Sequence, residues 1–373
     1  MKIKDFGVEI WMGLYENECK YNLAETCVES LTVSQVLDYA DSKEMAIEEI
    51  LNTKLTYGAI EGTDRLRKGI SKLYKKQDLE NISITHGGSG ANALSIMTIV
   101  EPGDKVVSML PTYQQLYSIP ESLGAEVKLL QLKPEDDFLP NLDELRKLVD
   151  KDTKLICINN PNNPTGAVMN EKMLEEIVEI AKAVDAYVLC DEAYRGLTHE
   201  GDNFTVSIAD LYKKGISTGS MSKTFSMAGV RIGWVAASKE FIEALSKQRD
   251  YQIISCGIVD DRLAAIAIEN KDSIIKRNLK IVRQNLDYLD RWVANEKLIS
   301  YVKPKGGTTA FLKFNIEVPS EELCLKLLRE KSVMLLPGSA LDMEGYLRIG
   351  YANTPSIIEE GLEKFSEFLT QYQ

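Results

Sequence analysis

Short apolar runs that alternate with long amphipathic stretches constrain the fold of this chain more than any other feature of its sequence. Each run has only four to six residues, which suits a strand buried on both faces of a sheet. Between two of the runs, residues 169–184 carry apolar side chains at steps of three and four, typical of a helix with one buried face. The expected strands are residues 82–85, 105–110, 126–130, 154–159, 186–191 and 233–238. This alternation predicts an α/β fold, with helices on both faces of a mostly parallel central sheet.

The alternation stops near residue 262, where one long helical stretch begins and continues to about residue 296. After it, expected strands at 308–316 and 346–352, with a helix near 320–331 between them, predict a smaller α+β unit. A chain of 373 residues has room for two to three domains of roughly 100–200 residues each. The predicted domains are residues 50–265 for the large one, and residues 1–49 together with 266–373 for the small one.

The charge balance excludes some classes of partner. The chain has 44 Lys and Arg against 56 Asp and Glu, a formal net charge of −12. Because an acidic protein is a poor match for nucleic acid or an anionic membrane, we expect neither as a partner. Asp5 and Glu9 interrupt the N-terminal segment before an apolar run forms, so we expect no signal peptide. No stretch approaches the roughly 20 apolar residues that cross a bilayer, and we expect a cytoplasmic protein.

The cysteines give no sign of a metal site. The chain has six of them, none in a CxxC pair, and only two histidines. We therefore expect no metal. Cysteines scattered through apolar segments behave as small hydrophobic residues, which agrees with a reducing cytosol.

Small residues follow the first expected strand of the large domain. Ligands of open parallel sheets bind beyond the carboxyl ends of the strands, so residues at these ends are the candidates for a binding site. Gly88, Ser89 and Gly90 form a tight turn into a helix, whose amides and dipole suit a phosphate. An ordinary helix start is the alternative, because short glycine-rich turns are weak evidence. His86, just before the turn, has either a structural role or a place at the edge of a cofactor.

An aromatic residue, an asparagine-rich turn and an acid follow or end the expected strands 105–110, 154–159 and 186–191. Tyr113 stacks on a planar ligand or simply packs into the protein. Asn163 lies between two prolines of the turn 160–166, where its amide can donate a hydrogen bond, although such residues also form turns without binding anything. Asp191 ends an apolar strand, where a carboxylate needs an ion-pair partner or the cationic N–H of a ligand.

The stretch GSMSKTFSMAGVRIGW at 219–234 places one lysine among small residues. An amine whose pKa falls on desolvation or near positive charge is a candidate to form a Schiff base, so Lys223 is either that residue or a solvated loop lysine. Arg231, eight residues later, presents a planar fork suited to phosphate.

Together these residues describe one ligand. It has a phosphate for Gly88, Gly90, Ser220 and Arg231, and a planar ring for Tyr113. Asp191 would face a protonated ring nitrogen, Asn163 and Tyr194 a ring oxygen, and Lys223 an aldehyde. Pyridoxal 5′-phosphate (PLP) carries all of these groups, and the sequence therefore predicts a PLP site.

Three motifs at these strand ends are specific. They are S-x-S-K-x(5)-G-x-R-x-G-W at 220–234, N-P-x-N-P-T-G at 160–166 and D-E-x-Y at 191–194. Weaker matches lie at 57–67, 85–91, 111–113 and 347–349. On these motifs the chain resembles, over nearly its whole length, the class I/II aminotransferase family of fold-type I PLP-dependent enzymes. The resemblance implies a large PLP-binding domain with a central sheet and a smaller α+β domain.

The resemblance also implies a role for each cofactor residue. Lys223 would form the Schiff base with PLP and then carry the proton between substrate and cofactor. Asp191 would keep the pyridine nitrogen protonated, while Asn163 and Tyr194 would hold the phenolic oxygen. The other implied cofactor residues are Ser89, Ser220, Ser222, Arg231 and the amides near Gly88 and Gly90.

Contacts to the substrate and to a second subunit follow in the same way. Arg348 would clamp the α-carboxylate of the substrate, with Asn163 beside it. Tyr57 resembles a tyrosine that reaches the cofactor phosphate of the neighbouring subunit, which implies a homodimer. A glycine-containing N-terminal segment of the family is replaced here by residues 22–27, which have no glycine. Glu25 in this segment either faces the substrate and favours a cationic or polar side chain, or is a helix-start or surface acid.

The implied function is that of an aminotransferase in amino acid metabolism, which moves an amino group between an amino acid and a 2-oxo acid by a ping-pong mechanism. A PLP-dependent carbon–sulfur β-lyase on the same fold is the alternative, since it would use the same Lys223, Asp191 and Arg231. A PLP-sensing regulator with a DNA-binding domain fits less well, because the family match begins near residue 20 and the chain is acidic. The sequence leaves the amino donor, the acceptor and the pathway open.

Overall fold

A seven-stranded sheet forms the centre of the molecule. The computed structural model describes residues 2–373. The strand order is β2-β8-β7-β6-β5-β3-β4, in which β8 is antiparallel to both neighbours and the other pairs are parallel. The strands are β2 (Ile82–His86), β3 (Lys105–Leu110), β4 (Glu126–Gln131), β5 (Thr153–Asn159), β6 (Tyr187–Asp191), β7 (Gly215–Ser220) and β8 (Ile232–Ala236). The predicted α/β fold around a mostly parallel sheet is confirmed.

Six of these strands coincide with the expected apolar runs, with ends that differ by no more than two residues. The seventh, β7, is absent from the sequence-based expectation because its residues GISTGS are mostly small and polar. The strand is nevertheless buried along its whole length between β6 and β8. Its small residues are required by its neighbours, since a Cβ atom on Gly219 would lie 2.3 Å from the indole of Trp234.

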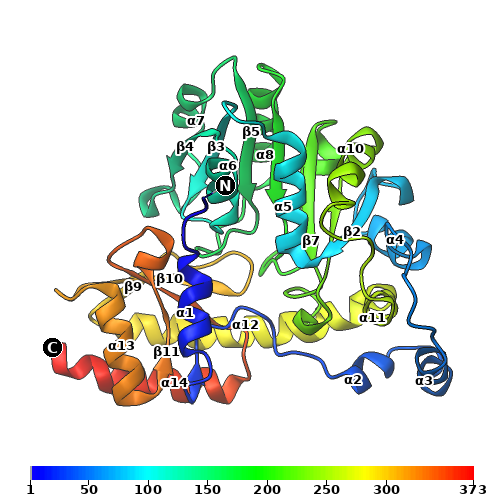
Figure 1. Ribbon diagram of the computed structural model, residues 1–373. Coiled ribbons are helices and arrows are strands. Elements are labelled where there is room, and N and C mark those ends of the chain that lie inside the picture. Colours follow the sequence, from blue (N-terminus) through cyan, green and yellow to red (C-terminus); the bar gives the residue numbers. More distant parts are fainter. Residues whose placement is uncertain (1) are drawn as a thin grey trace.

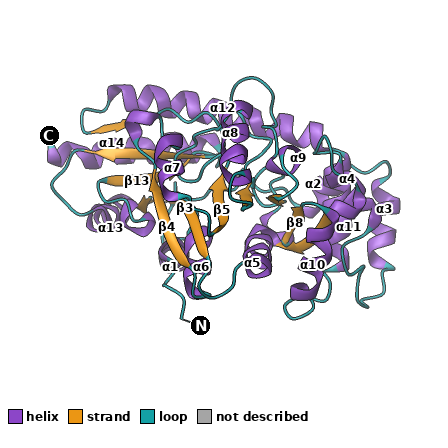
Figure 2. Ribbon diagram, turned by 90° about the horizontal axis from the view of Figure 1, so that it is seen from above, coloured by secondary structure: helices purple, strands orange, loops and turns teal. Residues whose placement is uncertain are grey.

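Helices cover both faces of the large sheet (Figures 1 and 2). In α8 the side chain of Asn170 accepts a hydrogen bond from the amide of Met173 and so caps the helix, while Leu174 and Ile177 are buried. The helices of this part are α4 (Asp64–Ser71), α5 (Gly87–Ile99), α6 (Gln115–Ser122), α7 (Leu142–Leu148), α8 (Glu171–Lys182), α9 (Ile208–Leu211), α10 (Lys239–Arg249) and α11 (Ile258–Glu269).

The expected single helix over residues 262–296 is wrong in one respect, because the structure has two helices there. Helix α11 ends at Glu269, and α12 (Lys271–Asn295) begins two residues later. Asn270 lies at the break with φ −108°, and its side chain amide donates to the carbonyl of Ile266. That side-chain bond ends α11 locally, whereas the apolar periodicity continues across the break.

A second, antiparallel sheet forms the core of the small domain. Its strand order is β12-β13-β10-β9, and α13 and α14 accompany it. The elements are β9 (Ile299–Tyr301), β10 (Thr309–Phe314), α13 (Ser320–Lys331), β12 (Leu336–Pro337), β13 (Tyr346–Gly350) and α14 (Pro355–Leu369). This arrangement agrees with the predicted α+β unit. Figure 1 shows α12 running along one side of the molecule from the large sheet to this domain.

The N-terminal segment contacts both parts of the molecule. In α1 (Gly7–Tyr15), Trp11 Nε1 donates a 2.9 Å hydrogen bond to the carbonyl of Leu335, and β1 (Tyr21–Asn22) pairs with β11 (Val333–Met334). Helices α2 (Val33–Leu37) and α3 (Lys43–Leu51) lie near α11, at the end of the molecule that is far from α13 and α14 (Figure 1). The domain boundaries at residues 50 and 265 stay a prediction.

Some features of the described residues bear on the expected partners. In residues 2–373 no helix is long and apolar enough to cross a membrane. Within the same range, no group of three or more His, Cys, Asp or Glu side chains could hold a metal ion. All six cysteines are free thiols.

We expect Gly219→Ala to destabilise the protein, because the added methyl group would overlap Trp234 in a buried strand. Overpacking of this kind costs about 1–3 kcal/mol. Urea unfolding followed by tryptophan fluorescence measures the change. Gly13→Ala in α1 is the matched control, since a Cβ there meets nothing within 4 Å. Equal unfolding midpoints for Gly219→Ala and the unmodified protein would contradict the close contact.

Candidate active site

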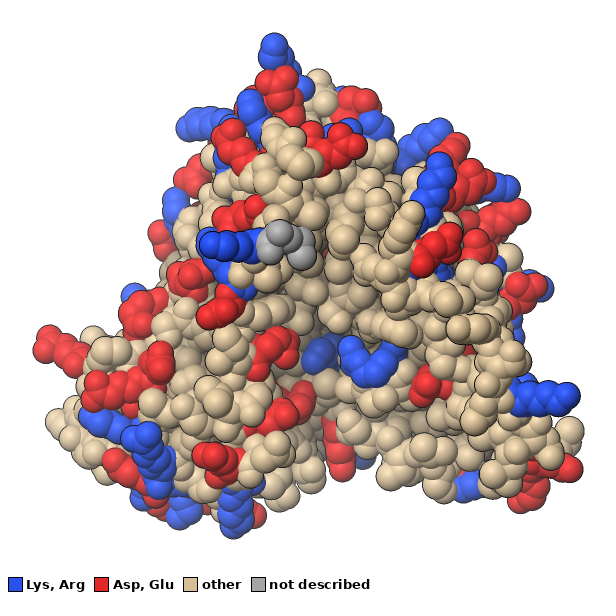
Figure 3. Space-filling view, viewed as in Figure 1, with Lys and Arg blue, Asp and Glu red and all other residues tan. Residues whose placement is uncertain are grey.

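A cavity of about 650 Å³ lies where the carboxyl ends of the large sheet meet α1, the segment 22–27 and β13. Figure 3 shows a hollow near the centre of this face, with basic side chains inside it and acidic ones along its rim. The predicted site residues that line the cavity are Glu25, Gly88, Ser89, Tyr113, Asn163, Asp191, Tyr194, Ser220, Ser222, Lys223, Arg231 and Arg348. Gly90 and Tyr57 are the two predicted residues outside this lining.

Hydrogen-bond donors gather at the start of α5. Gly87 has a φ of 68°, and a Cβ atom there would lie 2.4 Å from Nη2 of Arg231, so only glycine lets the guanidinium approach. Arg231 Nη1 lies 3.5 Å from the hydroxyl of Ser222, whose amide donates to Ser220 Oγ at 3.0 Å. His86 precedes the helix but makes no side-chain capping bond. Amides, hydroxyls and a guanidinium at one point form a suitable phosphate site.

Asp191 is buried at the end of β6. Two successive hydrogen bonds, which pass through a residue that sequence reasoning missed, hold its carboxylate. Its Oδ2 accepts a 2.8 Å hydrogen bond from the side chain of Asn92 on α5, and Thr218 on β7 donates to Asn92 Oδ1 at 2.6 Å. The amide of Ala193 donates to Oδ1. Burial raises the pKa of Asp191, against the lowering effect of Asn92, the Ala193 amide and Lys223. The one signal for Asn92 in the sequence was its position as a polar residue within the mostly apolar run ANALSI.

The amine of Lys223 points to the N-terminal segment. Its Nζ donates to Thr26 Oγ1 at 2.6 Å and to Cys27 Sγ at 3.3 Å. Burial lowers the pKa of Lys223, but Cys27, Tyr194 and Glu25 outweigh it, so the pKa is raised above its usual value. A lowered pKa is one way to activate a Schiff-base lysine, but the neighbours of Lys223 raise its pKa instead.

Glu25 turns one carboxylate oxygen back onto its own segment. Oε1 accepts hydrogen bonds from the amides of Thr26 and Cys27 at 2.7 and 2.6 Å. Burial raises the pKa of Glu25, but Lys223 and these amides outweigh it and lower the pKa below its usual value. The segment has no glycine of its own, but Gly350 on β13 makes room for it, since a Cβ there would lie 1.8 Å from the Glu25 carbonyl oxygen.

Arg348 on β13 is buried in the lining of the cavity, beside the segment 22–27. Its Nη1 donates to Asn163 Oδ1 at 3.3 Å and its Nη2 to the carbonyl of Ala24 at 3.1 Å. Burial lowers the pKa of Arg348, while Tyr194, Glu25 and further neighbours oppose that lowering. Arg348 Nε and the hydroxyl of Tyr194 are buried and have no hydrogen-bond partner within residues 2–373.

The remaining predicted residues occupy different environments. Tyr113 is partly buried, and its hydroxyl donates to Glu9 on α1 at 3.1 Å. Gly90 lies one turn into α5, where a Cβ would be in ordinary contact with His86. Tyr57 is 73% exposed on the surface, away from the cavity lining of its own chain.

These residues fit PLP. The unpartnered hydroxyl of Tyr194 is a donor for the phenolic oxygen of the cofactor, and the buried carboxylate of Asp191 is an acceptor for a protonated ring nitrogen. The donors at the start of α5 and Arg231 suit its phosphate, and the amine of Lys223 suits its aldehyde. The unpartnered Nε of Arg348 remains for a carboxylate of the substrate.

Comparison with known proteins gives consistent matches. The family described as "Aminotransferase class I and II" matches residues 9–365. The crystal structure of a PLP-dependent aminotransferase from Streptococcus suis has a TM-score of 0.97 and 44% identity, and the match covers 100% of this chain and 99% of that one. Capreomycidine synthase from Streptomyces vinaceus is 29% identical over 97% of this chain and 93% of its own length. Aspartate aminotransferase from Thermotoga maritima is 29% identical over 87% and 86%.

Two of these three relatives are named aminotransferases and none is named a lyase, so the carbon–sulfur β-lyase alternative is not favoured. The family match spans both the cofactor motifs of the large domain and Arg348 of the small one. The chain therefore belongs to the aminotransferase class I and II family, and it is a PLP-dependent aminotransferase.

Proposed function

We propose that the cavity around Lys223 is the active site and that it moves an amino group between an α-amino acid and a 2-oxo acid in two half-reactions. The observation that carries the proposal is the meeting of an amine, a buried carboxylate and a buried guanidinium in one cavity, on Lys223, Asp191 and Arg348. The unpartnered atoms of Tyr194 and Arg348 supply donors for the phenolic oxygen of the cofactor and for the α-carboxylate of the amino acid.

The residues divide the work by their chemistry. Bound PLP supplies a ring that draws negative charge away from the Cα atom of the amino acid. The planar fork of Arg348 binds the α-carboxylate, and fixing that group also fixes the direction of the Cα–H bond. Nζ of Lys223 would take the Cα proton as general base and, as general acid, deliver it to the cofactor. Thr26 Oγ1, at 2.6 Å, orients this amine.

The charges of the cavity support a particular class of side chain. Its three cations, Lys223, Arg231 and Arg348, all have roles toward the cofactor or the α-carboxylate. Four carboxylates line the same cavity, and Asp191 alone among them faces the ring nitrogen. The other three are Glu9, Glu16 and Glu25. Because no cation of this chain remains in the lining for a second substrate carboxylate, we propose an amino acid with a cationic or polar side chain.

A surface patch supports a homodimer in which Tyr57 of one subunit completes the partner's site. Residues 45–60, which include Tyr57, carry several strongly exposed apolar side chains, and large exposed apolar patches on soluble proteins mark interfaces. The patch consists of Met45 (71% exposed), Leu51 (78%), Leu55 (85%), Tyr57 (73%) and Ile60 (56%). We propose that this dimer works in the cytoplasm, and the six free thiols support a reducing compartment.

Lys223→Ala tests the assignment of the active site. We expect a loss of transamination by about 10³-fold or more, because a positioned general base contributes about 10²–10⁴. PLP should remain bound without a covalent link. Single-turnover absorbance changes with a set of amino acids measure both effects. Lys247→Ala, an exposed lysine on α10, is the control that should keep full activity. Full activity in Lys223→Ala would remove the proposal.

Glu9→Gln and Glu25→Gln test the substrate class. We expect each to lower the ratio of kcat/KM for lysine over norleucine about three- to fivefold, the value of one partly exposed ion pair. The pair of substrates differs in the terminal amine, so the ratio isolates the contribution of charge. Glu18→Gln, an exposed acid outside the cavity lining, is the control. A ratio that neither variant changes would exclude selection by these carboxylates and leave the role of Lys223 intact.

Mixing subunits tests the dimer. We expect Tyr57→Ala to lose PLP affinity and activity, because the partner's phosphate site loses one hydrogen-bond donor. Mixed with Lys223→Ala, it should recover activity, since one site of each mixed dimer then has both residues. Activity after refolding the two variants together, beside light scattering for mass, provides the measurement. Failure to recover, with a mass near one chain of 41.8 kDa, would contradict the shared site.

A further inference from the structure

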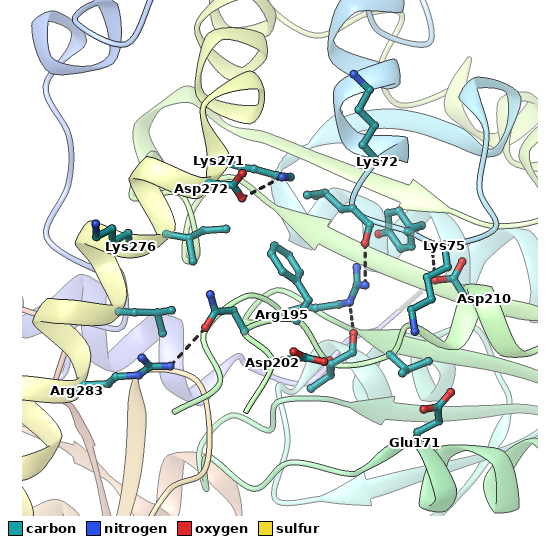
Figure 4. A pocket seen from close by; sticks show the side chains of 18 of the residues that line it. Lys72, Lys75, Glu171, Arg195, Asp202, Asp210, Lys271, Asp272, Lys276 and Arg283 are labelled. Carbon is teal, nitrogen blue, oxygen red and sulfur yellow. Dashed lines mark hydrogen bonds and ion pairs between the residues drawn. The ribbon is translucent and has the colours of Figure 1, made fainter. Parts of the chain in front are cut away.

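A second cavity lies apart from the active site and shares none of its lining residues. It has a volume of about 830 Å³, within the range of small-molecule sites. Three parts of the chain surround it: the end of α4 with the residues that follow, the loop 202–206, and the first half of α12. Figure 4 shows Arg195 near its centre, Lys72 and Lys75 on one side, and Lys271, Lys276 and Arg283 along α12 on the other.

The charge of this cavity is opposite to that of the whole chain. Seven basic side chains line it against four acidic ones, although the chain as a whole carries a net charge of −12. Four of the lysines have no carboxylate oxygen within 4.0 Å among residues 2–373. They are Lys72, Lys75, Lys276 and Lys280.

The acids of the cavity do little to neutralise these lysines. The carboxylate of Asp210 accepts hydrogen bonds from the backbone amides of Lys75 and Lys76, both at 2.9 Å. Asp272 pairs with Lys271 at 3.0 Å. The lysine amines on the two sides of the cavity therefore keep their charge for another group.

Lys276 and Lys280 lie one turn apart on α12, with Arg283 beside them on the same face. Like charges at this spacing destabilise a helix unless something neutralises them. The side chains of Ile275 and Leu279, which also line the cavity, are buried in the hydrophobic core and anchor this part of α12.

The floor of the cavity is built from ordered polar groups. Arg195 is 9% exposed, donates to the carbonyls of Thr205 and Leu73 at 2.7 and 2.8 Å, and lies over the rings of Tyr74 and Phe204. Two further lining residues carry buried polar atoms without a partner within residues 2–373. They are Arg283, at Nε, and Thr205, at Oγ1.

We propose that this cavity is a binding site for a small molecule with two or more negative charges. Lysines on opposite sides of the cavity match a ligand with negative charge at both ends. The cavity volume accommodates a phosphate compound or a polycarboxylate. Lys276 and Lys280 bind one end of the ligand, and Lys72 and Lys75 bind the other. Arg195 joins Leu73, two residues after α4, to the loop 202–206, and Arg283 on α12 donates to Asn203 of this loop at 3.4 Å, so hydrogen bonds connect the two groups of lysines through the floor.

Isothermal titration of the PLP-loaded enzyme at low salt tests the site, with inorganic pyrophosphate in one arm and citrate in the other. Bound PLP keeps both anions out of the phosphate site of the active cavity. We expect at least one of the two to bind, and its affinity to fall as salt rises. The arm that binds more tightly identifies phosphate or carboxylate as the recognised group.

The double variant K276Q/K280Q should weaken binding at least tenfold while transamination stays unchanged. K247Q on α10 removes an exposed lysine elsewhere and should bind like the unmodified enzyme. Circular dichroism checks that the variants fold. Absence of binding in both arms, or equal affinity in K276Q/K280Q, would overturn the site. Either result is independent of the active-site proposal, because turnover is measured separately.

Discussion

The burial of one carboxylate sets the arrangement of the surrounding sheet. Asp191 is 7% exposed at the end of β6, and a buried charge is costly unless hydrogen bonds compensate for it. The compensating hydrogen bonds come from two other elements. Asn92 on α5 donates to the Asp191 carboxylate, and Thr218 on β7 donates to the side chain of Asn92. Strand β7 must therefore lie directly beside β6, and α5 must cross both strands, for the buried Asp191 carboxylate to receive these hydrogen bonds.

The small domain completes the site through a contact between distant parts of the chain. Arg348 on β13 donates to the carbonyl of Ala24, and Gly350 on the same strand leaves space for the backbone of Glu25. Residues of β13 thus hold the segment 22–27 in place, and Thr26 of the same segment contacts Lys223. A movement of β13 relative to the large sheet would shift both Arg348 and Thr26, the hydrogen-bond partner of Lys223.

Residues at the ends of apolar strands were predictable from the sequence because strand order and side-chain chemistry suffice to bring them to one edge of a sheet. Asp191 is of this kind, and Lys223 and Arg231 were predictable from the small-residue stretch 219–234 that holds them, although the strand β7 before Lys223 was not. Asn92 was not, since its place depends on how α5 crosses the sheet, and no local pattern encodes that crossing. The strand β7 was missed for a related reason, because Gly219 is small to fit Trp234, which only the folded sheet brings near. The raised pKa of Lys223 likewise reflects neighbours from the N-terminal segment.

The two cavities differ in how their charges are compensated, and this difference separates the ligands they suit. In the active cavity, Lys223 and Arg348 lie near Glu25, and Asp191 lies close enough to Lys223 for its pKa to respond. Mixed charges at short range suit a substrate that is itself a zwitterion. In the second cavity Asp210 is bonded to backbone amides and Asp272 to a neighbouring lysine, and four other lysines have no carboxylate oxygen within 4.0 Å among residues 2–373. An excess of one sign around a hydrogen-bonded floor favours a ligand of the opposite sign, and no residue of this cavity lines the active cavity.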